Sequence, residues 1–307
     1  MNIDLTSILS DTLRAGTPLV LAALGELVTE KAGVLNLGVE GMMLVGAVAG
    51  FIATSVTGNL YLGLVAALVS GMAIALIHAV LAITLSANQV ATGLALTIFG
   101  SGLSAFVGAG YVGKTIAALQ PIGIPILKGI PVLGPALFNQ DILVYGSVIL
   151  VILVRWFLRS SRAGLVLRSI GESPEAADAL GLPVSGIRYL AVMFGGAMAG
   201  LAGAYLSLAY TPLWAENMTS GRGWIAIALV VFASWKPERI LFGAYLFGGV
   251  SAIQLVLQAM GVDISPYLLS ALPYLATILV LVLISRDRTR IQLGAPASLG
   301  QPFSPNH

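Results

Sequence analysis

The chain of 307 residues is 58% hydrophobic and only 9% charged, and its mean hydropathy is +0.97. A soluble domain carries about 25% charged residues, so these proportions exclude a soluble protein and indicate an integral membrane protein. The sequence contains no cysteine, which excludes a disulfide framework, a thiol nucleophile and a cysteine-ligated metal. The formal net charge of +2 is uninformative in total, whereas its distribution along the chain is informative.

Several apolar segments are candidates for membrane-spanning helices, because a helix needs about 20 apolar residues to cross the bilayer. They cover residues 12–29, 35–54, 60–85, 89–109, 141–158, 188–209, 223–235, 240–260 and 267–285. The segment 223–235 is short and 35–54 contains a glutamate, so either one fits a broken or re-entrant helix. No segment shows the alternation of an outer-membrane barrel. We therefore expect an all-α polytopic membrane protein, a single domain over residues 1–307 with about 8–10 transmembrane helices, one or two of them broken or re-entrant.

Basic residues gather in three of the regions between and after these segments. They are Arg155, Arg159, Arg162, Arg168 and Arg188, then Lys236 and Arg239, and finally Arg286, Arg288 and Arg290. If the segments alternate in direction, these three regions lie on the same side, which the positive-inside rule makes cytoplasmic. The C-terminus is then cytoplasmic and the N-terminus outside, although a re-entrant segment 35–54 would reverse the N-terminus.

The stretch GAGYVGKT, Gly108–Thr115, matches the pattern of a nucleotide-binding phosphate loop. Such a loop needs a buried strand before it and a helix after it, so that backbone N–H groups face the phosphates. Here a membrane helix precedes it, and Pro121, Pro125 and Pro131 interrupt the residues after it. A chance match is the better interpretation. We expect that this chain binds no ATP, and that any ATP that drives it is used by another subunit.

The polar loop at about 159–187 predicts one short helix. The run Ser-Pro-Glu at 173–175 is typical of a helix start, with an N-cap, a first-turn proline and an acid near the positive end. Gly181 fits the C-terminal end, which predicts a helix over Pro174–Leu180. A helix this short is marginal in water, so neighbouring helix ends or a partner must hold it. The residues alone leave open a structural turn between two spans and a docking element for a cytoplasmic partner.

Polar residues within the apolar segments are candidates for the solute path. Asn36 and Glu40 are four residues apart, which predicts that they share one helix face. An ionisable group in a span usually faces a cavity, but a hydrogen bond between helices is an equal alternative for Glu40.

Two further polar groups flank other segments. Asn88, Gln89 and Thr92 open the segment 89–109, where they either contact hydroxyl groups of a solute or cap the helix. Trp214 and Asn217 precede the short segment 223–235. Broken helices often border transport sites, although a tryptophan in this place is also typical of a membrane-interface anchor.

The segment 188–209 carries small residues at four-residue spacing. They are Gly195, Gly196, Ala199, Gly200 and Gly203. Such spacing predicts a helix that packs with its backbone close to the backbones of its neighbours.

Four stretches together resemble a known family. They are TEKAGVLNLGVEGMMLVGA from Thr29, ANQVATGLALTIF from Ala87, IGESPEAADALGLP from Ile170 and GRGWIAIALVVFASWKPERILFGAYLFGG from Gly221. In this order they resemble the permease subunit of a bacterial ATP-binding cassette (ABC) importer, in the family that serves simple sugars, nucleosides and branched-chain amino acids. The likeness is greatest to the nucleoside and simple-sugar branch, and it covers most of the chain.

The resemblance implies a function, partners and a location. The chain would form the path for a small polar solute, a nucleoside or simple sugar, by alternating access, without enzymatic activity of its own. The implied partners are an ATP-binding cassette subunit, a second and different permease chain, an extracytoplasmic solute-binding lipoprotein and the lipid bilayer of the bacterial cytoplasmic membrane. No nucleic acid, metal or cofactor is expected on this chain. The resemblance assigns the coupling helix to Ser173, Pro174, Glu175, Ala176, Ala177, Asp178 and Gly181.

Other functions fit the sequence less well. An ion-coupled secondary transporter needs intramembrane acids, and Glu40 is the clear candidate in mid-segment. A branched-chain amino acid permease stays open within the ABC class. An intramembrane enzyme is disfavoured because the sequence has no cysteine and no H-E-x-x-H motif. A structural scaffold would leave the capped loop helix unexplained.

Overall fold

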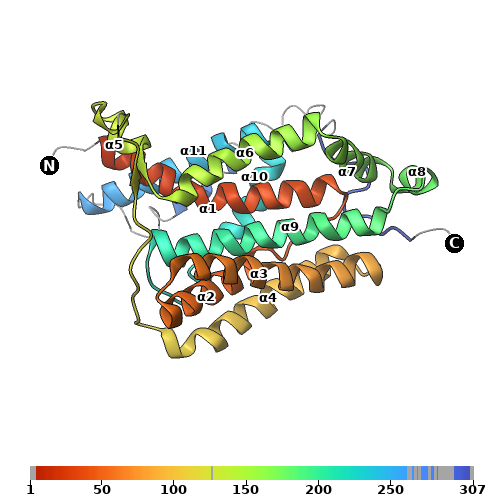
Figure 1. Ribbon diagram of the computed structural model, residues 1–307, viewed down its shortest axis with the longest axis horizontal. Coiled ribbons are helices and arrows are strands. Elements are labelled where there is room, and N and C mark those ends of the chain that lie inside the picture. The colour runs from red at the N-terminus through yellow and green to blue at the C-terminus, as the bar shows by residue number, and fades with distance from the viewer. Residues whose placement is uncertain are drawn as a thin grey trace.

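The computed structural model describes residues 5–125, 127–260 and 294–304, and residues 265, 268, 271–275, 278, 279 and 282 between the last two ranges. Figure 1 shows a bundle of long helices with short elements at both ends. The helices are α1 Leu5–Lys31, α2 Val39–Thr57, α3 Leu60–Ala79, α4 Gln89–Gly108, α5 Leu133–Leu137, α6 Ile142–Ser160, α7 Arg162–Glu172, α8 Pro174–Ala179, α9 Val184–Tyr205, α10 Arg222–Phe232 and α11 Pro237–Ala259. Strands β1 Ile122–Gly123 and β2 Asn139–Gln140 pair antiparallel. The predicted all-α polytopic membrane fold is confirmed.

Of the described helices, six are long and apolar enough to cross a membrane. They are α2, α3 with its π-helical extension Val80–Thr84, α4 with the 3-10 turn Ala109–Tyr111, α6, α9 with its π-helical extension Leu206–Tyr210, and α11. The 27-residue α1 covers the predicted segment 12–29, and the 11-residue α10 is the short segment 223–235. The predicted segment 267–285 lies largely outside the described residues.

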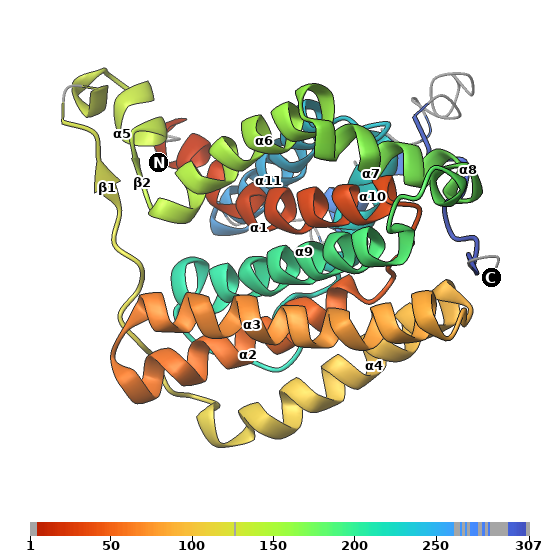
Figure 2. The ribbon, with the colours of Figure 1, turned by 45° about the vertical axis from the view of Figure 1, so that its right-hand side comes forward.

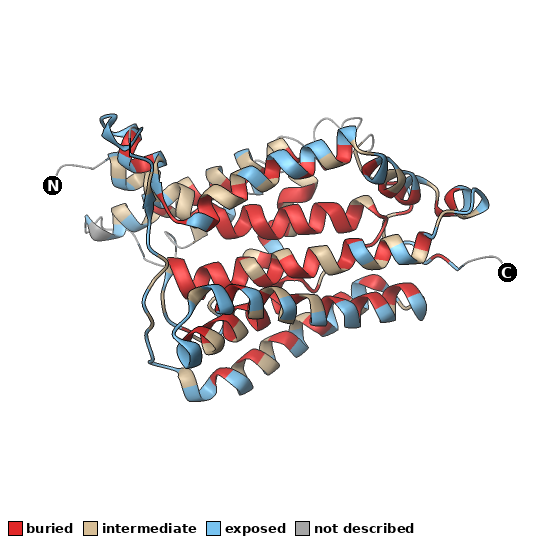
Figure 3. Ribbon diagram, in the orientation of Figure 1, coloured by how far each residue is buried: buried red, intermediate tan, exposed pale blue. Residues whose placement is uncertain are grey.

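Helices α1 and α9 form the centre of the bundle, and both are buried along most of their length (Figure 3). Helix α9 packs against α1, α2 and α3, while α1 also packs against α6, α10 and α11. The small residues of α9 permit this arrangement. A β-carbon added at Gly200 would lie 3.1 Å from Gly71 Cα of α3, and one at Gly195 would lie 3.3 Å from the Gly25 carbonyl oxygen of α1. The predicted close backbone packing is confirmed.

The two ends of the bundle carry different short elements (Figures 1 and 2). Helices α7 and α8 lie at one end together with residues 294–304, and we call this the α8 end. Helix α5, the β1–β2 hairpin and the start of α1 lie at the opposite end, which we call the α5 end. The long connection from α4 runs along the α5 end, and the chain then enters α6.

The stretch Gly108–Thr115 does not form a phosphate loop. Gly108 ends α4, and a 3-10 turn and irregular chain come next, with Gly113 in a left-handed conformation (φ +79°). Thr115 makes an isolated β-bridge with Leu213. Because a membrane-length helix precedes the loop and no helix continues it within residues 112–121, the backbone cradle for phosphates is not formed there.

Candidate translocation surface and coupling helix

A broken helix lies beside the start of α2. Residues 211–221 return from α9 as irregular chain, and α10 then begins at Arg222. Asn217, Ser220 and Gly221 have positive φ values of 54°, 48° and 81°, which produces tight turns. The N-terminus of α10 therefore points its unpaired backbone N–H groups at the neighbouring helix.

The Glu40 side chain accepts hydrogen bonds from backbone N–H groups at this helix end. Its Oε1 accepts hydrogen bonds from Thr219 Oγ1 at 2.6 Å and from the Gly221 N–H at 2.7 Å, and its Oε2 accepts from the Gly223 N–H at 2.6 Å. The side chain is 7% exposed. Oriented donors and the positive end of a helix stabilise a buried carboxylate, so this geometry gives Glu40 the role of a bond between helices.

The prediction that Asn36 and Glu40 share a helix face is wrong. The chain leaves α1 at Lys31 and is not helical again until Val39, so Asn36 lies in the break before α2. Its buried amide oxygen accepts from the Gly38 N–H at 2.9 Å, and its own N–H donates to Glu26 Oε1 at 3.0 Å. Asn36 thus stabilises the turn between the two helices.

Polar groups line an outward face of α4 and of the segment 211–221. Ser101 Oγ donates to Asn217 Oδ1 at 3.1 Å, and Ser220 Oγ donates to the Asn217 carbonyl at 3.2 Å. Tyr274 OH donates to the Ser220 carbonyl at 2.8 Å. Asn217, Ser220 and Tyr274 are exposed, and Ser101 lies within the candidate span Gln89–Tyr111. The sequence predicted Asn217 as a residue of the solute path but did not predict Ser101, because a single serine in an apolar helix is not distinctive. We call Ser101, Asn217, Ser220 and Tyr274 the polar face.

Trp214 lies behind this face, in the interior. It is 2% exposed and packs with Val48 and Phe51 of α2. A β-carbon added at Gly108 would lie 2.5 Å from the indole ring. The alternative of a membrane-interface anchor is therefore wrong for Trp214. Its ring Nε1 has no hydrogen-bond partner among the described residues.

Asn88, Gln89 and Thr92 lie near the α8 end, away from the polar face. Asn88 caps α4 by accepting from the Ala91 N–H at 3.0 Å. Gln89 is buried, and its Oε1 accepts from the Leu35 N–H at 2.8 Å. Thr92 donates to the Gln89 carbonyl at 3.1 Å. These contacts give the three side chains local structural partners, so the predicted path residues do not form one cluster.

An apolar cavity of about 640 Å³ lies between α1, α6, α7 and α9. Its lining includes Val28, Leu153, Trp156, Leu190 and Phe194, and all its other lining residues are apolar as well. A polar solute would lose its hydrogen bonds with water there without replacement. The cavity is therefore unsuited to a sugar or nucleoside, and it contains none of the predicted path residues.

The short loop helix forms as the sequence predicts. Helix α8 covers Pro174–Ala179, one residue shorter than expected. The Ser173 side chain caps it by accepting from the Ala176 N–H at 3.4 Å, and Gly181 comes after it with a φ of +77°. The loop also contains a second helix, α7, that the sequence did not predict.

The two faces of α8 differ in character. Pro174 and Ala177 are buried against the bundle, so the predicted coupling residues Pro174 and Ala177 hold the helix instead of forming its outer surface. Glu175 and Ala176 face outward. Leu180, directly after the helix, is 81% exposed. An apolar side chain is therefore accessible at the tip of this polar loop.

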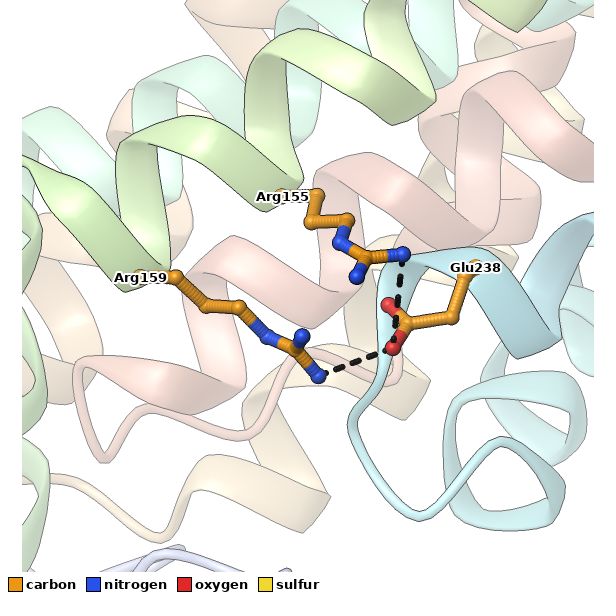
Figure 4. Close-up of polar contacts among 3 residues, drawn as sticks. All are labelled: Arg155, Arg159 and Glu238. Atoms are coloured by element: carbon orange, nitrogen blue, oxygen red, sulfur yellow. Dashed lines mark hydrogen bonds and ion pairs between the residues drawn. The ribbon is translucent and has the colours of Figure 1, made fainter.

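Ion pairs connect the helices at the α8 end. Figure 4 shows Arg155 and Arg159 of α6 reaching the same carboxylate, Glu238 in the first turn of α11. Arg159 Nη2 lies 2.9 Å and Arg155 Nη1 lies 3.9 Å from Glu238 Oε1. Exposed pairs of this type contribute up to about 1 kcal/mol, so their main effect is to fix α6 beside α11. Both arginines belong to the predicted basic side.

Membrane-length helices, a half-length helix beside a polar face, and a capped helix that projects from one end together define a polytopic helical membrane protein with a broken helix, an architecture that suits transport. Comparison with known sequences gives the particular family. Residues 8–284 match the family described as "Branched-chain amino acid transport system / permease component", and the chain belongs to that family.

Several of its relatives are named as permease proteins of ABC transporters. The chain is 45% identical to a putative glucose ABC transporter permease of Haloferax volcanii across 97% of both chains. It is 34% identical to a guanosine ABC transporter permease of Bacillus subtilis and 31% identical to a nucleoside ABC transporter permease of Lactococcus lactis, each across 90% of this chain and 91% of the relative. The chain is thus a multi-pass membrane permease component of an ABC transporter, and the alternative of a secondary transporter is not supported.

Proposed function

We propose that this chain forms one half of the translocation path of an ATP-driven importer and that α8 transmits motion from an ATP-binding subunit. The observation that carries the proposal is the outward face of α8. The helix is capped at both ends and is held by only two buried residues. It leaves the side chains of Glu175 and Leu180 exposed to solvent. ATP acts on the partner subunit, and this chain holds no cofactor.

The α8 end is the cytoplasmic end in this proposal. Lys31, Arg155, Arg159 and Lys236 belong to elements that meet there, in agreement with the positive-inside rule. The C-terminal residues 294–304 lie at the same end (Figure 1). The connection over residues 112–140 then faces the outside, where it offers a surface for an extracytoplasmic solute-binding lipoprotein.

The polar face is the proposed wall of the path. Polar groups exposed to lipid at membrane depth are unfavourable, because hydrocarbon offers no hydrogen-bond partners. Ser101 and Asn217 are therefore expected to face a water-filled path or a second permease chain. A path that forms between two permease chains provides both. We propose that Glu40 supports this wall from behind by fixing the start of α10.

We propose a sugar or nucleoside as the solute. The relatives are named for glucose, guanosine and nucleosides. The side chains of the polar face are hydroxyl and amide groups without a formal charge, which suits a neutral solute with many hydroxyls. A branched-chain amino acid would bring an ammonium and a carboxylate into the path, and these need opposite charges when removed from water.

The first experiment tests the docking surface. The chain is purified from native membranes in a mild detergent, and co-purifying proteins are identified by mass spectrometry. We expect an ATP-binding subunit with the wild-type chain, loss of this subunit with Leu180→Asp, and its retention with the conservative Leu180→Met. A wild-type chain that purifies alone and moves solute in liposomes without ATP would contradict the proposed function. Full retention of the subunit by Leu180→Asp would contradict the docking face.

A further inference from the structure

The described C-terminal segment, residues 294–304, returns to the α8 end and packs into the bundle. Pro296, Ser298 and Phe303 are buried. This burial is unexpected for a polar chain end, because terminal residues are usually poorly ordered unless specific contacts hold them. The segment lies against α7, α8, α9 and the break between α1 and α2.

Ser298 anchors the segment through polar contacts. Its N–H and its Oγ donate to the Gly171 carbonyl of α7 at 3.0 and 2.7 Å. Its Oγ also accepts from Arg188 Nη2 of α9 at 3.2 Å. The buried Arg188 in turn donates from Nε to the Ala32 carbonyl, just after α1, at 3.1 Å. One serine thereby joins α7, α9 and the end of α1.

Phe303 lies among the apolar residues that α7, α8 and α9 bury together. It is 6% exposed and forms a hydrophobic cluster with Ile170 of α7, Ala177 of α8 and Val184 of α9. The Arg188 guanidinium lies 5.6 Å from the centre of its ring, within the range of a cation–π interaction. Since α8 itself buries only Pro174 and Ala177, the cluster that includes Phe303 contributes to holding this helix in place.

The same segment contacts the chain break that leads to α2. The Gly300 N–H donates to the Gly33 carbonyl at 3.3 Å, and Lys31 Nζ donates to the Gly294 carbonyl at 2.8 Å. Gly33 has a φ of +86°, and a β-carbon there would collide with Ser298 Oγ. Gln89 Nε2, in the first turn of α4, donates to the Gln301 carbonyl at 3.4 Å. The segment therefore touches the elements that lead to Glu40 and to Ser101.

We infer that residues 294–304 form a coupling strap, in which Phe303 positions α8 and Ser298 with Arg188 connects α8 to the break before α2. This inference rests on the proposed docking role of α8 and goes beyond it. A short helix that moves with an ATP-binding subunit needs a stiff connection to the membrane helices, because interfaces with well-packed cores shift as units. The strap supplies this connection by packing, at positions far from α8 in sequence. Phe303 is thus a positioning residue.

Three variants of the full chain separate this inference from a merely structural role. Phe303→Ala removes the ring from the cluster that contains Ala177, Phe303→Leu keeps an apolar side chain there, and Ser304→Ala changes an exposed neighbour as the control. Hydrogen exchange of the purified chain is measured at the amides of residues 175–182. We expect exchange in Phe303→Ala to be faster by about tenfold or more, since local opening controls amide protection. Phe303→Leu should be intermediate, and Ser304→Ala should match the wild type.

The second readout is the amount of solute transported per ATP hydrolysed by the purified complex in liposomes. We expect this ratio to fall about tenfold in Phe303→Ala while the ATP-binding subunit stays bound, because a loosened α8 docks without moving the path. Unchanged exchange at residues 175–182 would overturn the inference. Faster exchange with an unchanged ratio would also overturn it, because the strap would then only stabilise packing. Absence of an ATP-binding subunit from the wild-type complex would instead contradict the proposed function, while the exchange result would still report on the strap.

Discussion

Glu40 shows how one acidic side chain completes a broken helix in a membrane protein. The first N–H groups of α10 have no partner within their own helix, and at membrane depth no bulk water reaches them. The Glu40 carboxylate accepts from Thr219, Gly221 and Gly223, and the helix dipole favours its negative charge. The donors at this helix end are therefore matched by the two oxygens of one side chain.

We expect Glu40→Leu to destabilise the protein strongly. The substitution leaves the half-buried Gly221 N–H and the buried Gly223 N–H without their acceptor, and an unsatisfied buried group costs about 1–3 kcal/mol. The apparent unfolding temperature in detergent and the amount of folded protein in the membrane should both fall. Glu40→Gln keeps one acceptor oxygen and a similar shape, so its unfolding temperature should lie between those of the wild type and Glu40→Leu.

Transport measurements on the same two variants distinguish the two roles of Glu40 that the sequence left open. If Glu40→Leu keeps the wild-type unfolding temperature yet loses transport, the side chain contacts the solute and its bonds to α10 are dispensable. A parallel loss of stability and transport supports the role as a bond between helices.

At the scale of elements, the bundle depends on glycines in α9 that let three other helices approach. A β-carbon at Gly196 would lie 2.5 Å from the Gly71 carbonyl oxygen, and one at Gly200 would overlap the Ala67 carbonyl. These are backbone atoms of α3, which cannot move aside as a flexible side chain can. Helix α9 is thus packed backbone to backbone against α3, and the contact leaves no room for a larger side chain.

We expect Gly200→Val to prevent correct packing of α9 against α3. Overpacking in a close-packed interior usually costs about 1–3 kcal/mol, and more where backbone must shift. Gly186, in the first turn of the same helix, is exposed, and an added β-carbon would lie 4.0 Å from Pro183 Cβ. Gly186→Val is therefore the matched control. Size-exclusion profiles in detergent should show aggregation of Gly200→Val and a normal peak for Gly186→Val, whereas identical normal profiles would contradict the close packing of these two helices.

The sequence predicted the elements whose signals are local. The ends of α8 were predictable from Ser173, Pro174 and Gly181, and the positions of α6, α9 and α10 from apolar length. Helix α7 was missed because its 11 residues mix charged, small and apolar side chains and form no apolar run such as the one in α10. The sequence allowed a broken helix in 35–54 but did not locate the break before α2, because four-residue spacing at Asn36 and Glu40 fits a helix equally well. The strap was not predictable, since the contact of Ser298 with Arg188 spans 110 residues and no local pattern marks it.

At the scale of the whole molecule, contacts and charge distinguish the two ends of the bundle. The α8 end gathers α7, α8 and the strap, together with the ion pairs of Glu238 to Arg155 and Arg159. The α5 end carries the hairpin β1–β2 and the connection that approaches it from α4 (Figure 2). An importer needs this asymmetry, because ATP is used on one side of the membrane and the solute arrives on the other.

The absence of cysteine from the sequence permits a direct measurement of this orientation. Single cysteines are introduced at Ala179, exposed in α8, and at Gly110, which is exposed near the α5 end with no atom close to an added β-carbon. A membrane-impermeant maleimide is then added to intact cells and to permeabilised cells. Because the positive-inside rule places the basic α8 end in the cytoplasm, Gly110→Cys should react in both samples and Ala179→Cys only after permeabilisation. The reverse pattern would place α8 and its strap outside the cell, where no ATP-binding subunit could reach them, and would contradict both the docking role of α8 and the coupling role of Phe303.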